Sequence, residues 1–235
     1  MRDSAMQSAT VSGDASLLHL LQLSSAALPV GGYSFSQGLE FAIDDGWLKT
    51  PDEVHDWIES AAQAVLGATD IPLLMRMLSA ARNKDTASLL QWNDVSLALR
   101  ESRELLDGDV AMGRALLRLL RDLGGWLPHD WQYNSMQASF VASFALASTH
   151  FLIADEAACT AYAWTWLENQ VMAATKLLPM GQTRAQQMLV ALSTSSAAVI
   201  AQAAHVPDVG IGMSLPGLAL ASARHETQYS RLYRS

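Results

Sequence analysis

The sequence of 235 residues carries few charged side chains and almost no cysteine. Asp, Glu, Lys and Arg make up 16% of the residues, below the share of about a quarter that soluble domains usually carry. We therefore expect part of the surface to be covered by partner proteins. The single cysteine, Cys159, cannot form an intramolecular disulfide and fits a reducing cytosol. The net charge of −8 argues against a general nucleic-acid-binding protein.

Long hydrophobic runs are also missing. The first fifteen residues are small and polar, which predicts a flexible tail over residues 1–15 and no signal peptide. The longest uncharged apolar run, residues 138–154, is short and contains serine, threonine and histidine. Such a run suits a buried helix better than a membrane span. We therefore expect a cytoplasmic protein that does not contact a membrane.

Motifs for catalysis and metal binding are absent at the level of local spacing. No two of the six histidines lie three or four positions apart, and there is no cysteine pair, so no local metal site is expected. A nucleophile elbow would need glycine where Ser36 stands. A phosphate-binding loop would need lysine and serine or threonine where Leu39 and Glu40 stand. The sequence thus predicts no catalytic residue, no metal and no cofactor.

Hydrophobic residues follow helical spacing, and no segment alternates as a strand would. Half of the residues are hydrophobic, which is enough for one large core or two small ones. We find no internal repeat. The pattern predicts an all-α, single-domain bundle of roughly ten helices over residues 16–235. The expected helices span residues 17–28, 39–45, 50–66, 70–82, 86–106, 109–123, 135–153, 156–178, 183–204 and 217–227.

Several residues set the expected helix boundaries. Thr50 to Glu53 reads as a capping box with proline in the first turn. Gly108 is expected to separate two helices, and Thr183 to cap the helix that follows it. The helix over residues 109–123 has an apolar stripe, and its arginines Arg114, Arg118 and Arg121 are interpreted as a solvent-facing side.

The most unusual stretch is a loop that reads Leu28-Pro29-Val30-Gly31-Gly32-Tyr33-Ser34-Phe35-Ser36-Gln37-Gly38-Leu39-Glu40. Pro29 predicts the end of the preceding helix, and the two glycines allow another chain to come close. The residues alone leave two interpretations open. The loop either binds a partner, or it is a corner whose Tyr33 and Phe35 fill the core.

Three stretches in order carry a resemblance to a known family. The loop resembles the LPxGxxxxSxGLE signature of the urease accessory protein F (UreF) family, and residues 166–182 and the tail at residues 225–235 are similar to its other motifs. The resemblance covers nearly the whole chain from Leu17. It implies an all-helical, homodimeric, non-enzymatic factor that binds UreD (UreH in some systems) and recruits the GTPase UreG. That complex would present the urease apoprotein for GTP-dependent nickel insertion and lysine carbamylation.

Two alternatives stand beside this interpretation. One is a GTPase-activating protein for UreG that supplies an arginine such as Arg231. The other is an α-helical enzyme whose site assembles only in the folded state. UreG turnover would separate the first alternative from an assembly factor, and a pocket of converging polar groups would favour the second.

The candidate partner-binding residues come from the loop, from Lys176 and from the tail. Lys176 either caps the carbonyls at its helix end or contacts a partner. The tail is basic and aromatic, which suits an interface, and it is expected to be loosely packed until a partner orders it. The alternative is a frayed terminus. The candidates are Tyr33, Ser36, Glu40, Lys176, His225, Glu226, Tyr229, Ser230, Arg231 and Tyr233.

Overall fold

The computed structural model describes residues 15–129, 131 and 137–234, and these residues form helices and loops with no strand among them. The all-α fold class is therefore confirmed. Residues 15–23 are helical. The further helices are α2 (Leu39–Asp44), α3 (Pro51–Ala62), α4 (Ile71–Arg82), α5 (Thr86–Ala98), α6 (Arg103–Asp122), α8 (Phe140–His150), α9 (Asp155–Leu177), α10 (Gln182–Ala203) and α11 (Pro216–His225). Apart from Ala15, the tail expected over residues 1–15 lies outside the described residues.

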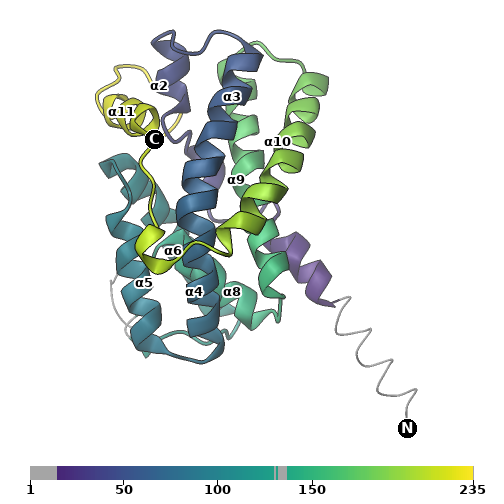
Figure 1. Cartoon of the computed structure of the whole chain (residues 1–235), viewed down its shortest axis with the longest axis vertical. Coiled ribbons are helices and arrows are strands. Elements are labelled where there is room, and N and C mark those ends of the chain that lie inside the picture. Colours follow the sequence, from purple (N-terminus) through teal and green to yellow (C-terminus); the bar gives the residue numbers. More distant parts are fainter. Residues whose placement is uncertain (1–14, 130, 132–136, 235) are drawn as a thin grey trace, which may run out of the picture.

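Helix α8 lies at the bottom centre of Figure 1 and packs against α4, α5, α6 and α9. Helix α8 contacts α4 and α6 most extensively, and α9 pairs with α10 beside them. Every residue from Phe140 to Ser148 is buried. The apolar run at residues 138–154 predicted a buried helix here, and the structure confirms it. At the other end of the molecule α2 packs against α11, close to the C-terminus.

Helices α3 and α4 form one continuous rod, because the π-helical segment Gln63–Asp70 joins them. The predicted capping box at Thr50 is present and starts this rod. The helix predicted over residues 70–82 is present as α4, with Pro72 in its first turn, but no break separates it from the π-helical segment. Proline has no N–H to donate to the carbonyl of Ala68, and that carbonyl instead accepts the N–H of Gly212 at 2.8 Å. The helix therefore continues through Pro72.

By length and composition the rod Pro51–Arg82 is also a stretch that could cross a membrane. Of its most apolar window, 67% is buried inside the fold. Its apolar surface therefore packs against the other helices, as in a core helix.

The break expected at Gly108 is displaced. Helix α6 starts after Ser102, whose side chain accepts the N–H of Leu105, and it continues through Gly108. A Cβ at Gly108 would lie 3.1 Å from the Phe35 ring, so this glycine makes room for the loop rather than ending a helix. Further along α6, the arginines at positions 114, 118 and 121 are exposed, as expected.

Two other expected boundaries are shifted. The first helix ends at residue 23 rather than 28, and Leu28 and Val30 are buried in turns beyond it. Helix α10 begins at Gln182 with Gly181 at the N-cap position, and Thr183 does not cap it. Both shifts leave the order of the helices unchanged.

Candidate functional site

The loop that follows residue 28 separates its two aromatic residues. Phe35 is buried against Gly108, whereas the side chain of Tyr33 is 63% exposed. The core interpretation therefore applies to Phe35 alone. Tyr33 lies outside the core, where another molecule could contact it.

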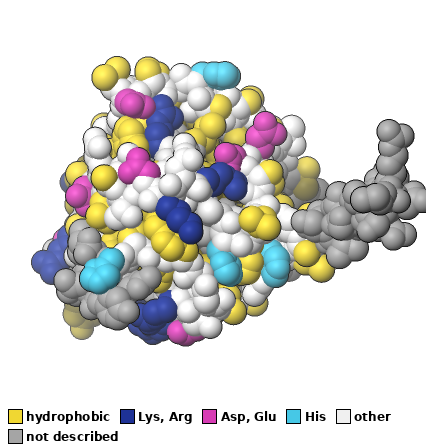
Figure 2. Space-filling model, turned by 90° about the horizontal axis from the view of Figure 1, so that it is seen from below, with side chains coloured by type: hydrophobic (Ala, Val, Ile, Leu, Met, Phe, Trp, Pro, Cys, Tyr) yellow, Lys and Arg dark blue, Asp and Glu magenta, His cyan; other side chains and the backbone are white. Residues whose placement is uncertain are grey.

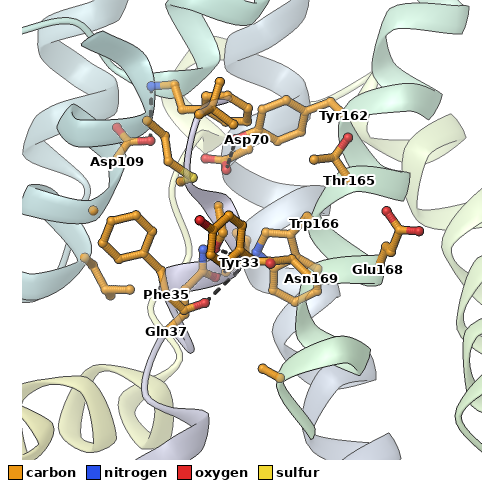
Figure 3. Close-up of a pocket in the computed structure, with 18 of the residues that line it drawn as sticks. Tyr33, Phe35, Gln37, Asp70, Asp109, Tyr162, Thr165, Trp166, Glu168 and Asn169 are labelled. Carbon is orange, nitrogen blue, oxygen red and sulfur yellow. Dashed lines mark hydrogen bonds between the residues drawn. The ribbon is translucent and has the colours of Figure 1, made fainter. Parts of the chain in front are cut away.

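The loop is held on α9 by side-chain hydrogen bonds (Figure 3). Asn169 Nδ2 donates to the Gly32 carbonyl at 2.8 Å, and Trp166 Nε1 donates to Gln37 Oε1 at 2.8 Å. Gly38 follows with a φ of +84°, and a Cβ there would lie 2.9 Å from the backbone nitrogen of Ser222 in α11. Only glycine fits both the left-handed angle and this close approach.

The tail folds back onto the loop through Glu40. Glu40 is 4% exposed, and its two carboxylate oxygens accept the N–H groups of Leu232 at 2.6 Å and Tyr233 at 2.9 Å. The N–H of Arg234 donates to the carbonyl of Ser34 at 2.8 Å. Tyr233 is buried, at 7% exposed. The expectation of a loosely packed tail is therefore wrong, because Glu40 satisfies the tail's backbone donors within the chain itself.

His225 lies between two carboxylates and is fully buried. Its Nε2 is 3.0 Å from Glu40 Oε2, and its Nδ1 is 2.7 Å from Glu104 Oε2. Each ring nitrogen therefore lies within hydrogen-bond distance of a different carboxylate. Arg231 completes the group, because its Nη1 donates to Glu104 Oε1 at 2.8 Å. We refer to Glu40, Glu104, His225 and Arg231 as the tail anchor.

The ten predicted partner-binding residues thus divide into two sets. Ser36, Glu40, His225 and Tyr233 are buried. These four position the loop and the tail, so in this conformation they do not face a partner directly. The other six are exposed: Tyr33, Lys176, Glu226, Tyr229, Ser230 and Arg231. Lys176 is not buried in its helix end, and its Nζ lies 5.6 Å from the centre of the Tyr233 ring, in a cation–π contact.

A pocket of about 180 Å³ lies behind the loop, between α6, α9 and the central rod. Tyr33, Phe35 and Gln37 line it from the loop, and Trp166 and Asn169 line it from α9 (Figure 3). Four further polar residues of its wall were not singled out in the sequence: Asp70, Arg100, Asp109 and Tyr162.

Arg100 lies at the centre of this group. Its Nη1 forms an ion pair with Asp70 Oδ1 at 2.9 Å, and its Nη2 forms one with Asp109 Oδ1 at 3.3 Å. The Tyr162 hydroxyl donates to Asp70 Oδ2 at 2.7 Å, and the N–H of Phe140 donates to Asp109 Oδ1 at 3.2 Å. Both carboxyl groups are more than nine-tenths buried. Two acids therefore share one guanidinium away from water.

This arrangement shifts the protonation of its members. Burial raises the pKa of Asp109 to about 6, with Arg100 opposing the rise and Asp70 adding to it. Burial raises the pKa of Tyr162 as well, and the Asp70 carboxylate raises it further. Burial alone would lower the pKa of Arg100, but Asp109 and Asp70 outweigh it and raise that pKa. Of the three groups whose pKa is shifted, Asp109 is the one whose protonation changes nearest neutral pH.

Asp109→Asn is expected to stabilise the protein at about pH 7.5 and to have little effect near pH 4.5. The folded chain retains the Asp109 proton up to about pH 6, whereas the ordinary value is 3.8. The unfolded chain therefore loses this proton first, and the contribution of Asp109 to stability falls as the pH rises from about 4 to about 6. Urea unfolding of both proteins across this range measures the difference. If the wild type became more stable relative to the variant as the pH rises, the raised pKa of Asp109 would be contradicted.

Other chemistry receives little support from the described residues. Among them, no group of three or more His, Cys, Asp or Glu side chains is placed to hold a metal ion. Cys159 is buried, and burial raises the pKa of its thiol to about 12, so it is not poised as a nucleophile.

Comparison with known proteins gives one consistent result. The UreF family model matches residues 48–193. A protein of Marinomonas sp. named "Urease accessory protein UreF" is 47% identical over 226 residues, which cover 96% of each chain. Proteins with the same name from Hahella chejuensis and Teredinibacter turnerae are 44% and 46% identical, over 93% of this chain and 98% of theirs.

Proposed function

This chain belongs to the UreF family of urease accessory proteins, and from that membership we propose that it acts in urease maturation as a non-enzymatic assembly factor. In this proposal it works in the cytoplasm as a homodimer. It binds UreD or UreH and the GTPase UreG, and the complex presents the urease apoprotein for GTP-dependent nickel insertion. Nickel is the cargo of that complex rather than a resident cofactor of this chain.

The observation that carries the proposal is the surface formed by the anchored tail beside the loop. Tyr229 is fully exposed, Leu232 is 75% exposed, and Tyr33 is 63% exposed. Arg231 stands among them with its side chain 39% exposed. Arginine and tyrosine are the side chains that most often dominate the energy of an interface. Because the tail anchor fixes the backbone beneath them, little entropy need be lost when a partner binds.

Exposed apolar side chains occur elsewhere as well. Figure 2 shows the lower end of the molecule, where hydrophobic side chains lie at the surface between a few basic and acidic ones. A surface with so little charge fits a protein that works within a larger assembly.

No observation specifically favours either alternative, the GTPase-activating protein or the α-helical enzyme. The guanidinium of Arg231 is engaged by Glu104, whereas an arginine finger must reach into another protein's site. The pocket has converging polar groups, but three of them are ion-paired with one another in the Asp70–Arg100–Asp109 group. We therefore base the proposal on assembly alone.

Arg231→Ala is expected to weaken the complex with UreD or UreH and UreG at least tenfold, which corresponds to about 1.4 kcal/mol. A guanidinium can form two parallel hydrogen bonds to a carboxylate and an ammonium cannot, so Arg231→Lys should restore only part of the affinity. Tyr33→Ala should weaken the complex as well, with a melting temperature within a few degrees of the wild type, because Tyr33 is exposed. Co-purification and urease activation in cells that express the full set of accessory proteins are the measurements.

The matched control is Arg121→Ala, which also removes one arginine charge. Arg121 lies near the end of α6, whereas Glu104, the partner of Arg231, lies near its start. Glu104 and Arg121 are 17 residues apart in that helix, or roughly 25 Å at 1.5 Å per residue. Point substitutions are cleaner than deletion of residues 225–235, because the loss of His225 would leave Glu40 and Glu104 buried with fewer partners. Normal assembly and normal urease activation by both Arg231→Ala and Tyr33→Ala would refute the proposed surface.

A further inference from the structure

The buried acids behind the loop carry more negative charge than the described residues neutralise. Arg100 is the one cation that contacts Asp70 and Asp109 among the described residues. With both acids ionised, the group therefore keeps a charge of −1. Asp109 Oδ2 is buried and accepts no hydrogen bond within the described part of the chain. A buried carboxylate oxygen without a donor is costly, so it indicates a missing cationic or donor group.

The rest of the pocket wall adds to this imbalance. Glu101 and Glu168 also line it, whereas Lys176, the further cation of the described wall, contacts the Tyr233 ring. Burial raises the pKa of Glu168, which indicates that its carboxyl group lacks a compensating charge. Glu104 lines the pocket too, but His225 and Arg231 already engage it. The pocket as a whole is therefore complementary to a positive charge.

Asp70 lies in the part of the central rod that has an uncommon, π-helical backbone conformation. The π-helical segment Gln63–Asp70 supplies Val65, Thr69 and Asp70 to the wall. Such segments make up well under 1% of residues, and they are frequent at functional sites. Together with the unpaired oxygen of Asp109, this placement points to a binding site rather than to a purely structural ion pair.

Apolar and aromatic side chains line the same pocket as the acids. They include Leu99, Leu105, Met112 and Phe140, together with Trp166 (Figure 3). The exposed side chain of Tyr33 marks the mouth. An apolar stem that ends in a cation matches this lining, because the stem can pack on the apolar walls while the charge meets the acids and the aromatic faces.

We propose that the pocket binds the side chain of a lysine or arginine that a partner protein inserts past Tyr33, with its cationic end directed at Asp70 and Asp109. The mouth adjoins the surface formed by the loop and the tail, so a partner docked there brings its side chains to the pocket. The inference goes beyond the proposed function, because it concerns a cation site that can be measured on the isolated chain.

The test uses n-pentylamine, which carries the stem and charge of a lysine side chain, and 1-pentanol as its neutral counterpart. For the full-length wild-type chain at about pH 7.5 we expect a dissociation constant for the amine in roughly the millimolar range, as for other very small ligands. The amine should bind at least tenfold more tightly than the alcohol. Ligand-observed NMR titration measures both constants.

Asp109→Asn should abolish the tenfold preference while the variant keeps its fold. Equal binding of amine and alcohol by the wild type, or an unchanged preference in the variant, would overturn the site. If the variant does not fold, the wild type still tests the inference. Protonation of Asp109 should then weaken amine binding, but not alcohol binding, when the pH falls from about 7.5 to about 5. A preference that does not change with pH would likewise overturn it.

A second arm identifies the source of the cation. Pentylamine at a concentration well above its dissociation constant should release the other urease accessory proteins from this chain, and pentanol should not. If the amine binds saturably but the complex stays intact, the pocket does not hold a side chain of a partner protein. The pocket would then be assigned to a free amine. The titration uses the isolated chain, so its failure is distinct from a failure of the proposed function.

Discussion

Arg100→Met is expected to lower the free energy of unfolding by about 3–5 kcal/mol, because it leaves two carboxyl groups buried without their cation. Arg100 is the residue that pairs with both Asp70 and Asp109. Methionine is similar in length and apolar, so the packing of the stem is largely kept. The loss therefore reports on the charge. Urea unfolding followed by circular dichroism measures it.

The matched control is Arg103→Met. Arg103 lies three positions away, its side chain is 82% exposed, and it faces Asp107 at 3.5 Å on the surface of α6. An exposed pair of this kind contributes at most about 1 kcal/mol, so the control should remain near the wild type. The triple variant Arg100→Met, Asp70→Asn, Asp109→Asn should recover part of the loss. Equal stability of the Arg100 and Arg103 variants would show that the buried group is not held as described.

Gly113→Ala is expected to destabilise the protein by an amount at the upper end of about 1–3 kcal/mol. Inside a helix this change normally stabilises by up to about 1 kcal/mol. In α6, however, a Cβ at Gly113 would lie 2.2 Å from the carbonyl oxygen of Ala138 and 2.8 Å from the backbone of Ser139. The neighbouring atoms are backbone, so α6 and α8 must move apart. The separation would also stretch the bond from Ser143 Oγ to the Gly113 carbonyl, now 2.9 Å.

Gly217→Ala in α11 is the control for this change. A Cβ there would meet only the Trp57 ring, at the ordinary contact distance of 3.5 Å. The alanine should therefore leave the melting temperature unchanged or raise it slightly. Thermal unfolding of both variants gives the comparison, and a Gly113→Ala protein as stable as Gly217→Ala would exclude the close approach of α6 and α8.

Local signals in the sequence predicted the helices well wherever neighbouring residues decide the outcome. The capping box at Thr50 needs only residues three positions apart, and the structure contains it. The uncharged apolar run at residues 138–154 was enough to predict a buried helix, and the structure buries Phe140 to Ser148 within it. The arginines at 114, 118 and 121 follow from helical spacing in the same way. The loop signature, together with the stretches at residues 166–182 and 225–235 in the same order, indicated the family without any structure.

Contacts between distant residues corrected the sequence predictions. Gly108 and Pro72 look like helix breakers. At Gly108 the Phe35 ring fills the space where a side chain would lie. At Pro72 the Ala68 carbonyl, which has no donor from the proline, accepts the N–H of Gly212. The tail looks mobile because its residues are polar and aromatic. It is packed because Glu40, some 190 positions earlier in the sequence, accepts the N–H groups of Leu232 and Tyr233. No local pattern contains that information.

The sequence by itself therefore determined the fold class, the order of the helices and the family, since each depends on short-range spacing or on motifs that stand in order. The tertiary structure alone decided which candidates face solvent and which are buried. It also brought together Asp70, Arg100, Asp109 and Tyr162, which come from four separate segments and carry no shared motif. The physical reason is that burial and charge pairing depend on packing between distant parts of the chain, which the spacing of residues along it does not encode.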